Sequence, residues 1–320
     1  MAETPSAVSA GPTPQHSGAK RPRPSGVEMD VQEVMQSMDL TSDYMVLGID
    51  EAGRGPVVGP MVYTAALISL EEHDRLIDEC HVADSKMLTE HHRDAALLRL
   101  RQLKTFQSFT RVISADEIAA AMFGRHGATL NTISHDAAMA LIAEATLAAA
   151  GKLCAVYVDT VGPPESYQAR LAGRFPHIRV TVAKKADSKY PIVSAASIVA
   201  KTTRDRAVAD LHVDVGSGYP SDPAAMRWVR GHVHRFFVHP RAYSFVRSSW
   251  GPVIKLATDP AVCHPVLFEQ DLEAEEKKRG QRTSADHGKQ QRLLFAKPHT
   301  RRHAVYSHLL RLRTLSGTEE

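Results

Sequence analysis

Cysteine is scarce in this chain of 320 residues, and the few that occur exclude two common architectures. Cys80, Cys154 and Cys263 lie far apart, and none belongs to a Cys-x-x-Cys pair. An odd and scattered set argues against a disulfide scaffold and against a zinc site built on thiolates. The cysteine pattern therefore favours a reducing compartment.

Long apolar runs are also missing. No stretch approaches the roughly 20 consecutive apolar residues that a membrane-spanning helix needs. The first residues contain no apolar core before a cleavage site, so we expect no secretory signal. Hydrophobic residues still make up 43% and charged residues 23%, close to the globular average, which excludes wholesale disorder. We expect a globular protein that does not enter a membrane.

Positive charge is outnumbered by negative charge over most of the chain and is concentrated at one end. Residues 277–313 hold eleven Lys and Arg against one acid, Asp286, whereas the remainder holds 28 basic and 35 acidic residues. A net-negative body argues against nonspecific coating of nucleic acid by the whole surface. If the body handles nucleic acid, it must use a local basic site, bound cations, or both.

Proline and small polar residues dominate the N-terminal segment. Residues 1–26 contain five of the 18 prolines among Ser, Thr, Gly and Ala. Such a segment buries too little apolar surface to offset its ordering entropy, so residues 1–43 are predicted to be a disordered tail. Within it, Lys20, Arg21 and Arg23 can serve as a nuclear import signal or form an ordinary solvated basic cluster.

The central part of the chain predicts an α/β domain over residues 44–258. Short β-prone runs predict five strands, and caps and periodicity predict helices, so we expect a mixed five-stranded sheet flanked by helices. The predicted strands are 44–50, 57–69, 106–113, 154–159 and 177–185, and the predicted helices include 114–124, 135–150, 194–212 and one begun by Asp222-Pro223.

The C-terminal part, residues 259–320, differs in kind. Pro265 can start a helix that carries acids in its first turns and Lys277, Lys278 and Arg279 at its end, the charge order that a helix dipole favours. We expect a small helical appendage followed by a basic tail.

Four acids follow strand ends, and this placement points to chemistry. Asp50 and Glu51 end the first predicted strand, Asp159 ends the fourth, and Asp187 lies in the turn after the fifth. Neighbouring strands would bring these carboxylates to one sheet edge, where they repel unless protonated or bound to cations. Mg²⁺ and Mn²⁺ prefer such oxygen ligands, and two ions about 3.5–4 Å apart form a known clamp for phosphodiester hydrolysis.

A glycine-rich turn follows the first pair of acids. Gly53, Arg54 and Gly55 permit close approach of the backbone to a phosphate or sugar, and the arginine adds a charged donor. A tight hairpin connection would use the same residues, and no Lys-Ser or Lys-Thr follows to make a P-loop.

These residues belong to an ordered series of motifs. IDEAGRGPVVGPMVYTA (49–65) resembles the opening motif of type 2 ribonucleases H, and the resemblance covers roughly residues 44–250. The Ser-Trp pair in FVRSSWGPVI is similar to that of the eukaryotic catalytic A subunits of this family. The further matching motifs are ADSKML (83–88), LNTISHDAAM (130–139), VYVDTVG (156–162), KKADSKYPIVSAASIVAKTTRD (184–205) and GSGYPSDP (216–223).

The resemblance implies an RNase H-like fold and assigns roles to particular residues. It implies that two Mg²⁺ or Mn²⁺ ions are held by the catalytic acids Asp50, Glu51, Asp159 and Asp187. It also implies that Gly53, Arg54 and Gly55 read the ribose 2′-hydroxyl, the group that distinguishes RNA from DNA, and that Tyr219 stacks on the following sugar.

Two further residues of the matching motifs have open assignments. Lys86 and Asn131 are expected to contact the phosphate backbone, or to be a solvated loop lysine and a turn residue before the 135–150 helix. Lys184 and Lys185 are either groove cations or solubilising charges. Three histidines, His232, His234 and His239, lack the partners of a zinc site, and Trp228 and Trp250 are interpreted as packing residues.

The activity implied by the resemblance is endonucleolytic cleavage of the RNA strand of RNA–DNA hybrids and cleavage 5′ of single ribonucleotides in duplex DNA. The products are 5′-phosphate and 3′-hydroxyl ends, and the implied setting is ribonucleotide removal in the nucleus. Two accessory subunits, B and C, are implied partners. The basic tail can dock them, for example through residues 293–295 and 304–312, or can grip nucleic acid.

Two other functions deserve comparison. A non-catalytic scaffold protein would be expected to have lost one or more of the four acids, and all four are present. An integrase-like strand transferase would have no use for a turn and a tyrosine that read a 2′-hydroxyl.

Overall fold

The computed structural model describes residues 41, 43–82, 89–124, 127–232, 244–259 and 261–262. The predicted N-terminal tail up to residue 40, the predicted helix starting at Pro265, the basic tail and Lys86 lie outside the described residues.

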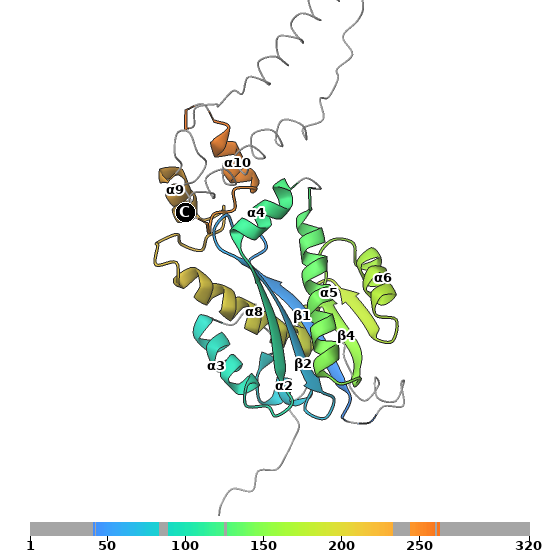
Figure 1. Cartoon of the computed structure of the whole chain (residues 1–320). Helices are drawn as coiled ribbons and strands as arrows, with labels where there is room; N and C mark the ends of the chain where they lie inside the picture. The colour runs from blue at the N-terminus through green and yellow to red at the C-terminus, as the bar shows by residue number, and fades with distance from the viewer. Residues whose placement is uncertain are drawn as a thin grey trace, which may run out of the picture.

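A five-stranded mixed sheet forms the centre of the fold, as the sequence predicts (Figure 1). Its order is β3-β2-β1-β4-β5, with antiparallel pairing of β1 with β2 and of β2 with β3, and parallel pairing of β1 with β4 and of β4 with β5. The strands are β1 (Met45–Ala52), β2 (Met61–Ser69), β3 (Gln107–Ile113), β4 (Leu153–Asp159) and β5 (Arg179–Ala183).

Two strand boundaries differ from the sequence prediction. Residues 57–60 form a loop rather than the start of β2, and Val58 pairs there with Val246 in an isolated bridge. The fifth strand is shorter than 177–185, because Lys185 adopts a left-handed φ of 55° that ends the extended backbone and begins a one-turn helix, α7 (Ala186–Lys189). Asp187 therefore lies in a helical turn.

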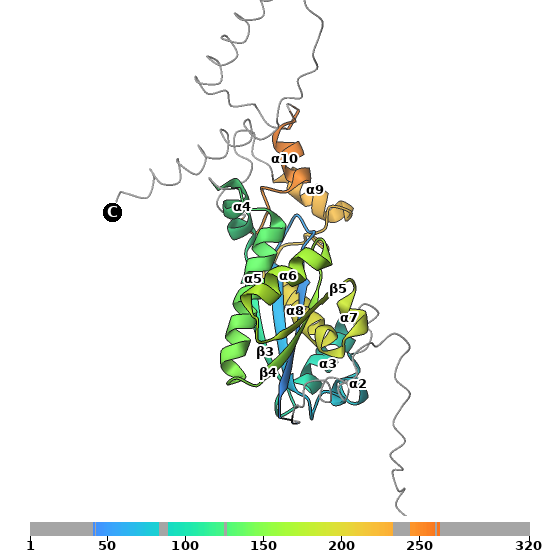
Figure 2. The ribbon, with the colours of Figure 1, turned by 90° about the vertical axis from the view of Figure 1, so that its right-hand side faces the viewer.

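Helices cover both faces of the sheet, as Figure 2 shows. On one face α8 (Pro191–Ala209), α3 (Glu90–Leu100) and α2 (Arg75–Asp78) share an apolar core with β1 and β2. On the other face α5 (Leu130–Ala148), α6 (Pro164–Arg174) and α4 (Ala115–Phe123) close a second core. None of the helices in the described segments is long and apolar enough to cross a bilayer.

Side-chain caps explain where several helices begin. Ser114 caps α4 by accepting from the N–H of Glu117, as its capping-box pattern predicts, and Asp222 caps α9 (Pro223–Gly231) through the N–H of Ala224. The prediction for α5 was wrong at its start, because Thr129 accepts from the N–H of Thr132 and initiates the helix five residues before 135. Asn131 consequently lies in the first helical turn.

Gly48 allows β1 and α8 to approach closely. A Cβ atom at this position would lie 2.4 Å from the backbone carbon and oxygen of Ile192, which is nearer than real Cβ contacts come. Only glycine fits between the strand and the helix. This close packing brings α8 alongside the end of β1, where Asp50 lies.

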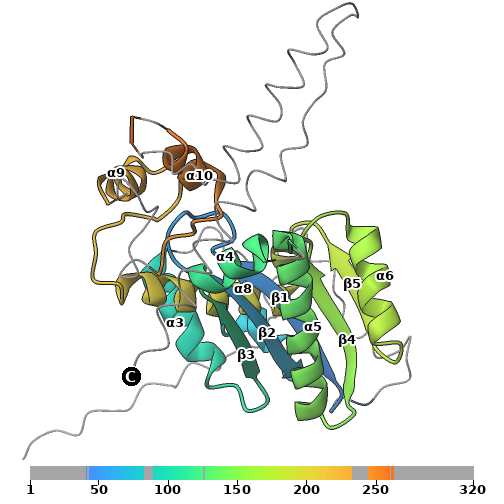
Figure 3. The same cartoon turned by 45° about the horizontal axis from the view of Figure 1, so that its top comes forward.

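The last described segment packs against the loop that follows β1. Helices α9 and α10 (Gly251–Ala257) lie beyond the end of the sheet from which this loop leaves (Figure 3). Val57 and Val58 from the loop share a small apolar core with Val229, Val246 and Val253. Residues separated by almost 200 positions therefore fix the same loop.

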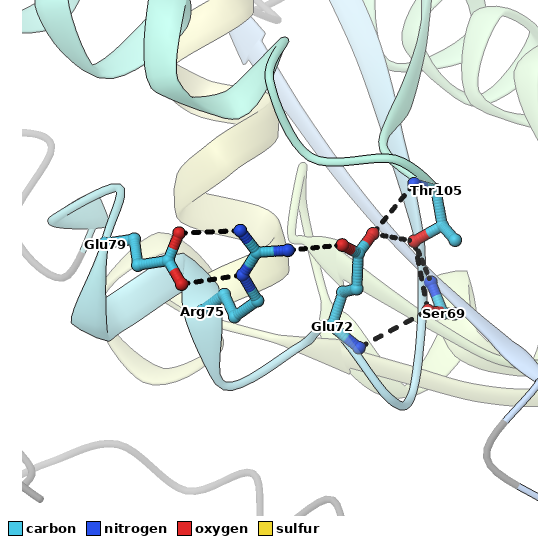
Figure 4. A network of polar contacts seen from close by, with 5 residues as sticks. All are labelled: Ser69, Glu72, Arg75, Glu79 and Thr105. Carbon is cyan, nitrogen blue, oxygen red and sulfur yellow. Dashed lines mark hydrogen bonds and ion pairs between the residues drawn. The ribbon is translucent and has the colours of Figure 1, made fainter. Parts of the chain in front are cut away.

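A polar network holds the opposite end of the sheet (Figure 4). Buried Glu72 accepts hydrogen bonds from the Thr105 hydroxyl at 2.6 Å and the Thr105 N–H at 2.8 Å, and pairs with Arg75 at 2.5 Å. Arg75 also pairs with Glu79 at 2.7 Å. Burial opposes ionisation of Glu72, but these partners outweigh it and lower its pKa.

Candidate active site

The four predicted acids meet where the parallel strands end. Asp50 and Glu51 lie near the end of β1, Asp159 is the last residue of β4, and Asp187 follows β5 in α7. Asp50 is within electrostatic range of both Asp159 and Asp187, and Glu51 is within range of Asp159. The predicted convergence of these residues at one sheet edge is therefore present.

The side chains of Asp50 and Glu51, which are neighbours in the chain, project from β1 to opposite faces of the sheet. The carboxyl group of Asp50 lies on the α8 side, where it interacts with Ser197, and it accepts from the N–H of Glu51 at 2.8 Å. Glu51 lies directly opposite Tyr63 of β2, on the side covered by α5 and α6. This alternation follows from the two-residue period of a strand.

Burial and mutual repulsion raise the pKa values of both acids. Burial, together with the charges of Asp159 and Asp187, raises the pKa of Asp50 to about 7 against the hydrogen bond from Ser197. Burial and then the charges of Asp50 and Asp159 raise the pKa of Glu51 to about 8. The cluster thus concentrates negative charge that its protein neighbours do not fully compensate.

Asp159 is tied to the segment that carries Asp187. Its Oδ1 atom accepts from the N–H of Ala186 at 2.9 Å, immediately after Lys185 with its left-handed backbone. A left-handed conformation is unfavourable for a lysine. It is retained where the chain must turn sharply to bring Asp187 beside the end of β4.

The donor chemistry of this cluster fits a hard divalent cation. Ionised carboxylates only accept hydrogen bonds, and Glu51 Oε2 is buried without a partner among the described residues. Within the described part of the chain, however, no three His, Cys, Asp or Glu side chains already form a set that could hold a metal ion.

A pocket of about 230 Å³ lies beside Glu51. Its lining includes Glu51, Gly53, Arg54, Gly55 and Tyr219, which are all predicted site residues. Gly53 has a φ of +73°, and a Cβ atom there would lie 2.6 Å from the carbonyl oxygen of Pro60, so the turn requires glycine. Glu51 therefore connects the acid cluster with the pocket that the predicted sugar-reading residues line.

Three lining residues from α8 were missed by the sequence analysis: Lys201, Arg204 and Asp205. The guanidinium of Arg204 lies 5.5 Å from the ring centre of Tyr219 and donates to the carbonyl oxygen of Ser217 at 2.6 Å. Their spacing of three and four residues on a helix that follows Asp187 would have placed them on one face.

Two more missed residues hold the glycine-rich turn. Arg247 is fully buried and donates to the carbonyl oxygens of Gly53, Arg54 and Gly59, and its burial lowers its pKa to about 10. Trp250, interpreted from the sequence as a packing residue, also donates from Nε1 to the Gly55 carbonyl oxygen at 3.1 Å. Both belong to the FVRSSW segment that the resemblance includes.

Arg54 turns toward the start of α5. Its guanidinium donates to Ser134 Oγ at 2.6 Å and to Asn131 Oδ1. Asn131 is therefore part of the site, next to Arg54, rather than a turn residue before the helix. Its predicted contact with a phosphate stays a prediction, as does that of Lys86.

The remaining sequence interpretations concern residues near the site. Lys184 and Lys185 are exposed. Trp228 stacks on His232 with ring centres 4.1 Å apart and contacts Phe245, which confirms its packing role. His234 and His239 lie outside the described residues.

Comparison with known proteins identifies the family. The model of the ribonuclease HII family matches residues 47–253. The chain belongs to the ribonuclease HII family. It is 47% identical to the A subunit of ribonuclease H2 from Rattus norvegicus over 217 residues, which cover 64% of this chain and 70% of that protein. Relatives of this name across eukaryotes and the family match identify it as a ribonuclease H enzyme.

Solved ribonucleases share the fold. Ribonuclease H2 from Pyrococcus horikoshii aligns with a TM-score of 0.53 at 32% identity, covering 66% of this chain and 96% of that one. Bst-RNase HIII, solved in complex with Mn²⁺, has a TM-score of 0.53 at 20% identity and covers 75% of this chain and 76% of its own. The ribonuclease HII fold thus accounts for the mixed sheet and its flanking helices.

Proposed function

We propose that this ribonuclease H cleaves the RNA strand of RNA–DNA hybrids and also cuts 5′ of a single ribonucleotide in duplex DNA, leaving 5′-phosphate and 3′-hydroxyl ends. One observation carries the proposal. Glu51 belongs to the acid cluster and also lines the pocket formed by Gly53, Arg54, Gly55 and Tyr219. A sugar recognised in that pocket lies next to the groups that would act on its phosphate.

Asp50, Glu51, Asp159 and Asp187 would hold two divalent cations, Mg²⁺ or Mn²⁺. Such ions lower the pKa of an attacking water and stabilise the charge of the leaving oxygen. The raised pKa values of Asp50 and Glu51 and the unpartnered Glu51 oxygen support a cation here, because a positive charge would relieve both. A relative of the same fold was solved with Mn²⁺.

The remaining residues bind and orient the substrate. The backbone of the turn at Gly53–Gly55 and the Arg54 side chain would contact the ribose. Hydrogen bonds from Arg247 and Trp250 fix the shape of this turn. Tyr219 is 37% exposed at the pocket, where its ring can pack on the next sugar. A deoxyribose has less bulk at that position, which favours an RNA-to-DNA junction. Lys201 and Arg204 supply positive charge on the pocket wall.

The assembly and location of the enzyme are parts of the same proposal. The relatives are each named as the A subunit of ribonuclease H2, which supports a complex with at least one further subunit. We assign accessory B and C subunits as partners and the nucleus as the location, where ribonucleotides embedded in DNA require removal. Deletion of residues 263–320 tests docking, because loss of co-purifying subunits would support it and intact assembly would contradict it.

A duplex with one ribonucleotide tests the activity directly. The purified enzyme with Mg²⁺ should cut on the 5′ side of the ribonucleotide and leave an otherwise identical all-DNA duplex intact. Asp50→Asn should lose at least about 100-fold in rate, because one carboxylate of the cation site is removed. Equal cutting of both duplexes would refute recognition of the 2′-hydroxyl, and full activity of the variant would refute the role of the acid cluster.

A further inference from the structure

Three buried polar atoms behind the acid cluster have no hydrogen-bond partner among the described residues. They are Oε2 of Glu51 and the hydroxyl oxygens of Tyr63 and Tyr167. Both tyrosines are almost inaccessible, with 1% of each residue exposed. Buried polar groups in native proteins nearly always have a partner, so three in one region require an explanation.

The three groups lie on the same side of the sheet. Glu51 of β1 and Tyr63 of β2 are directly opposite each other in the antiparallel register, an arrangement that places their Cβ atoms about 4.5–5.5 Å apart. Tyr167 comes from α6, which packs on this face, and its ring stacks on His135 of α5 at 3.9 Å. The stacking fixes the direction of the Tyr167 ring.

Electrostatic interactions agree with this placement. After burial, the charge of Glu51 is the largest influence that raises the pKa of Tyr63, and the same is true for Tyr167. In return, the Tyr63 hydroxyl opposes the rise in the pKa of Glu51. Both phenols therefore stay protonated and keep a proton to donate.

The hydrogen-bonding capacities of the three groups are complementary. The two hydroxyls bring two donors, and a carboxylate oxygen accepts two hydrogen bonds. The nearby Ser134 Oγ accepts from Arg54 at 2.6 Å, donates to the Leu130 carbonyl oxygen at 2.8 Å and also interacts with Tyr63. Glu51 Oε2 is the charged acceptor on this side of the sheet, and it has no partner among the described residues.

We propose that Tyr63 and Tyr167 are positioning residues for Glu51, whose Oε2 atom accepts their two hydroxyl protons directly or through one shared buried water. This assignment rests on the proposed function, in which Glu51 is a cation ligand. In this arrangement the Oε2 atom of Glu51 faces the two tyrosines. The Oε1 atom then faces the pocket, Asp50 and Asp159.

The double variant Tyr63→Phe/Tyr167→Phe tests the proposal, because it removes both donors and keeps both rings. The binding of Mn²⁺ to the full-length chain is measured without substrate, and electron paramagnetic resonance detects the bound and free ion. Loss of partners that orient a metal ligand typically weakens metal binding by about 10–100-fold. We therefore expect the dissociation constant for Mn²⁺ to increase at least tenfold. The Mn²⁺ concentration for half-maximal cleavage should rise by the same factor.

Matched variants separate this proposal from the proposed function. Tyr44→Phe removes a tyrosine hydroxyl just before the other end of β1 and should leave Mn²⁺ binding unchanged. Asp50→Asn should weaken Mn²⁺ binding severely. If wild type and Asp50→Asn bind Mn²⁺ alike, the metal site itself is wrong. If only Asp50→Asn is impaired and the double phenylalanine variant equals wild type, the tyrosines do not position Glu51.

A crystal structure of the wild-type chain provides a second measurement that needs no variant to fold. The expected result is each hydroxyl within hydrogen-bonding distance of Glu51 Oε2 or of one water that also contacts it. Hydroxyls directed to other acceptors, with Oε2 bound elsewhere, would overturn the proposal.

Discussion

Arg247 donates a hydrogen bond of 2.8 Å to the carbonyl oxygen of Arg54, 193 residues earlier in the chain. The same guanidinium reaches the carbonyl oxygens of Gly53 and Gly59, so one buried side chain fixes both the start and the end of the loop between β1 and β2. Within the described part of the chain, no carboxylate contributes to the pKa of Arg247, and three peptide carbonyl groups accept its hydrogen bonds. The loop therefore depends on a residue that does not line the pocket.

Arg247→Lys should damage both stability and activity. An ammonium group on a thinner side chain cannot replace a planar fork that serves three carbonyl groups. At least one buried carbonyl would lose its partner, at a cost of about 1–3 kcal/mol. Chemical denaturation measures the lost free energy of unfolding, and steady-state cleavage of a single-ribonucleotide duplex should show a higher KM together with a lower kcat.

Arg111→Lys is the matched control. Arg111 is about half exposed on β3 and makes one ion pair with Glu117 at 3.1 Å. The same exchange there should change the free energy of unfolding by less than about 1 kcal/mol and leave both kinetic constants unaltered. Similar effects of the two exchanges would show that the loop does not depend on the Arg247 fork.

The acid cluster should make the metal-free enzyme less stable as pH rises. The folded-state pKa values of about 7 for Asp50 and about 8 for Glu51 exceed the unfolded values of about 4. The folded state then binds more protons than the unfolded state, so the contribution of these groups is fully present below about pH 4 and is lost as pH rises through about 7–8. In EDTA, thermal unfolding should occur several degrees lower at about pH 8.5 than at about pH 6.

Two comparisons isolate this effect. Addition of Mg²⁺ at the higher pH should restore the unfolding temperature, because a cation replaces the protons. The variant Asp50→Asn/Glu51→Gln should show a flatter pH dependence in EDTA. If the double variant kept the full slope of the wild type, other groups would be responsible and the repulsion within the cluster would be unimportant.

Much of this site was predictable from sequence because it depends on strand ends. Asp50, Glu51 and Asp159 follow β-prone runs, and parallel neighbours bring such positions together regardless of the loops between them. The start of α5 was mispredicted because the Thr129 cap and the first helical turn, which contains Asn131, carry no strong apolar period that would mark them as helical. The end of β5 depends on the left-handed Lys185, a conformation that local sequence does not reveal.

The residues that sequence reasoning missed act through long-range contacts. Arg247 and Trp250 bind backbone carbonyl groups of a loop almost 200 residues away, and backbone acceptors leave no signal in a side-chain pattern. The position of Arg204 above Tyr219 depends on how α8 passes the end of β1, which Gly48 controls by steric fit. Motif reading therefore found the groups proposed to contact substrate more readily than the groups that hold them.

Tyr219→Ala should harm one substrate more than the other. The ring lies at the pocket, with its edge 3.4 Å from a Cβ atom built at Gly55, so a sugar bound at the turn would extend over it. A single ribonucleotide offers one junction, and loss of a stacked ring costs about 1–3 kcal/mol, or about 10–100-fold in rate. A continuous hybrid has many alternative registers and should lose less. Equal losses on both substrates would remove Tyr219 from the discrimination.

Gly48→Ala should test whether the fit between β1 and α8 sets up the site. The added methyl group would lie 2.4 Å from the Ile192 backbone, and a helix backbone cannot rotate away as a side chain can. The helix must shift, which should cost at least about 3 kcal/mol and displace Ser197, Lys201 and Arg204 together. Denaturant unfolding measures the first effect and kcat/KM the second. Gly173→Ala on α6, where a Cβ atom meets nothing within 4 Å, should instead stabilise the protein by up to about 1 kcal/mol, and comparable behaviour of the two variants would refute the steric argument.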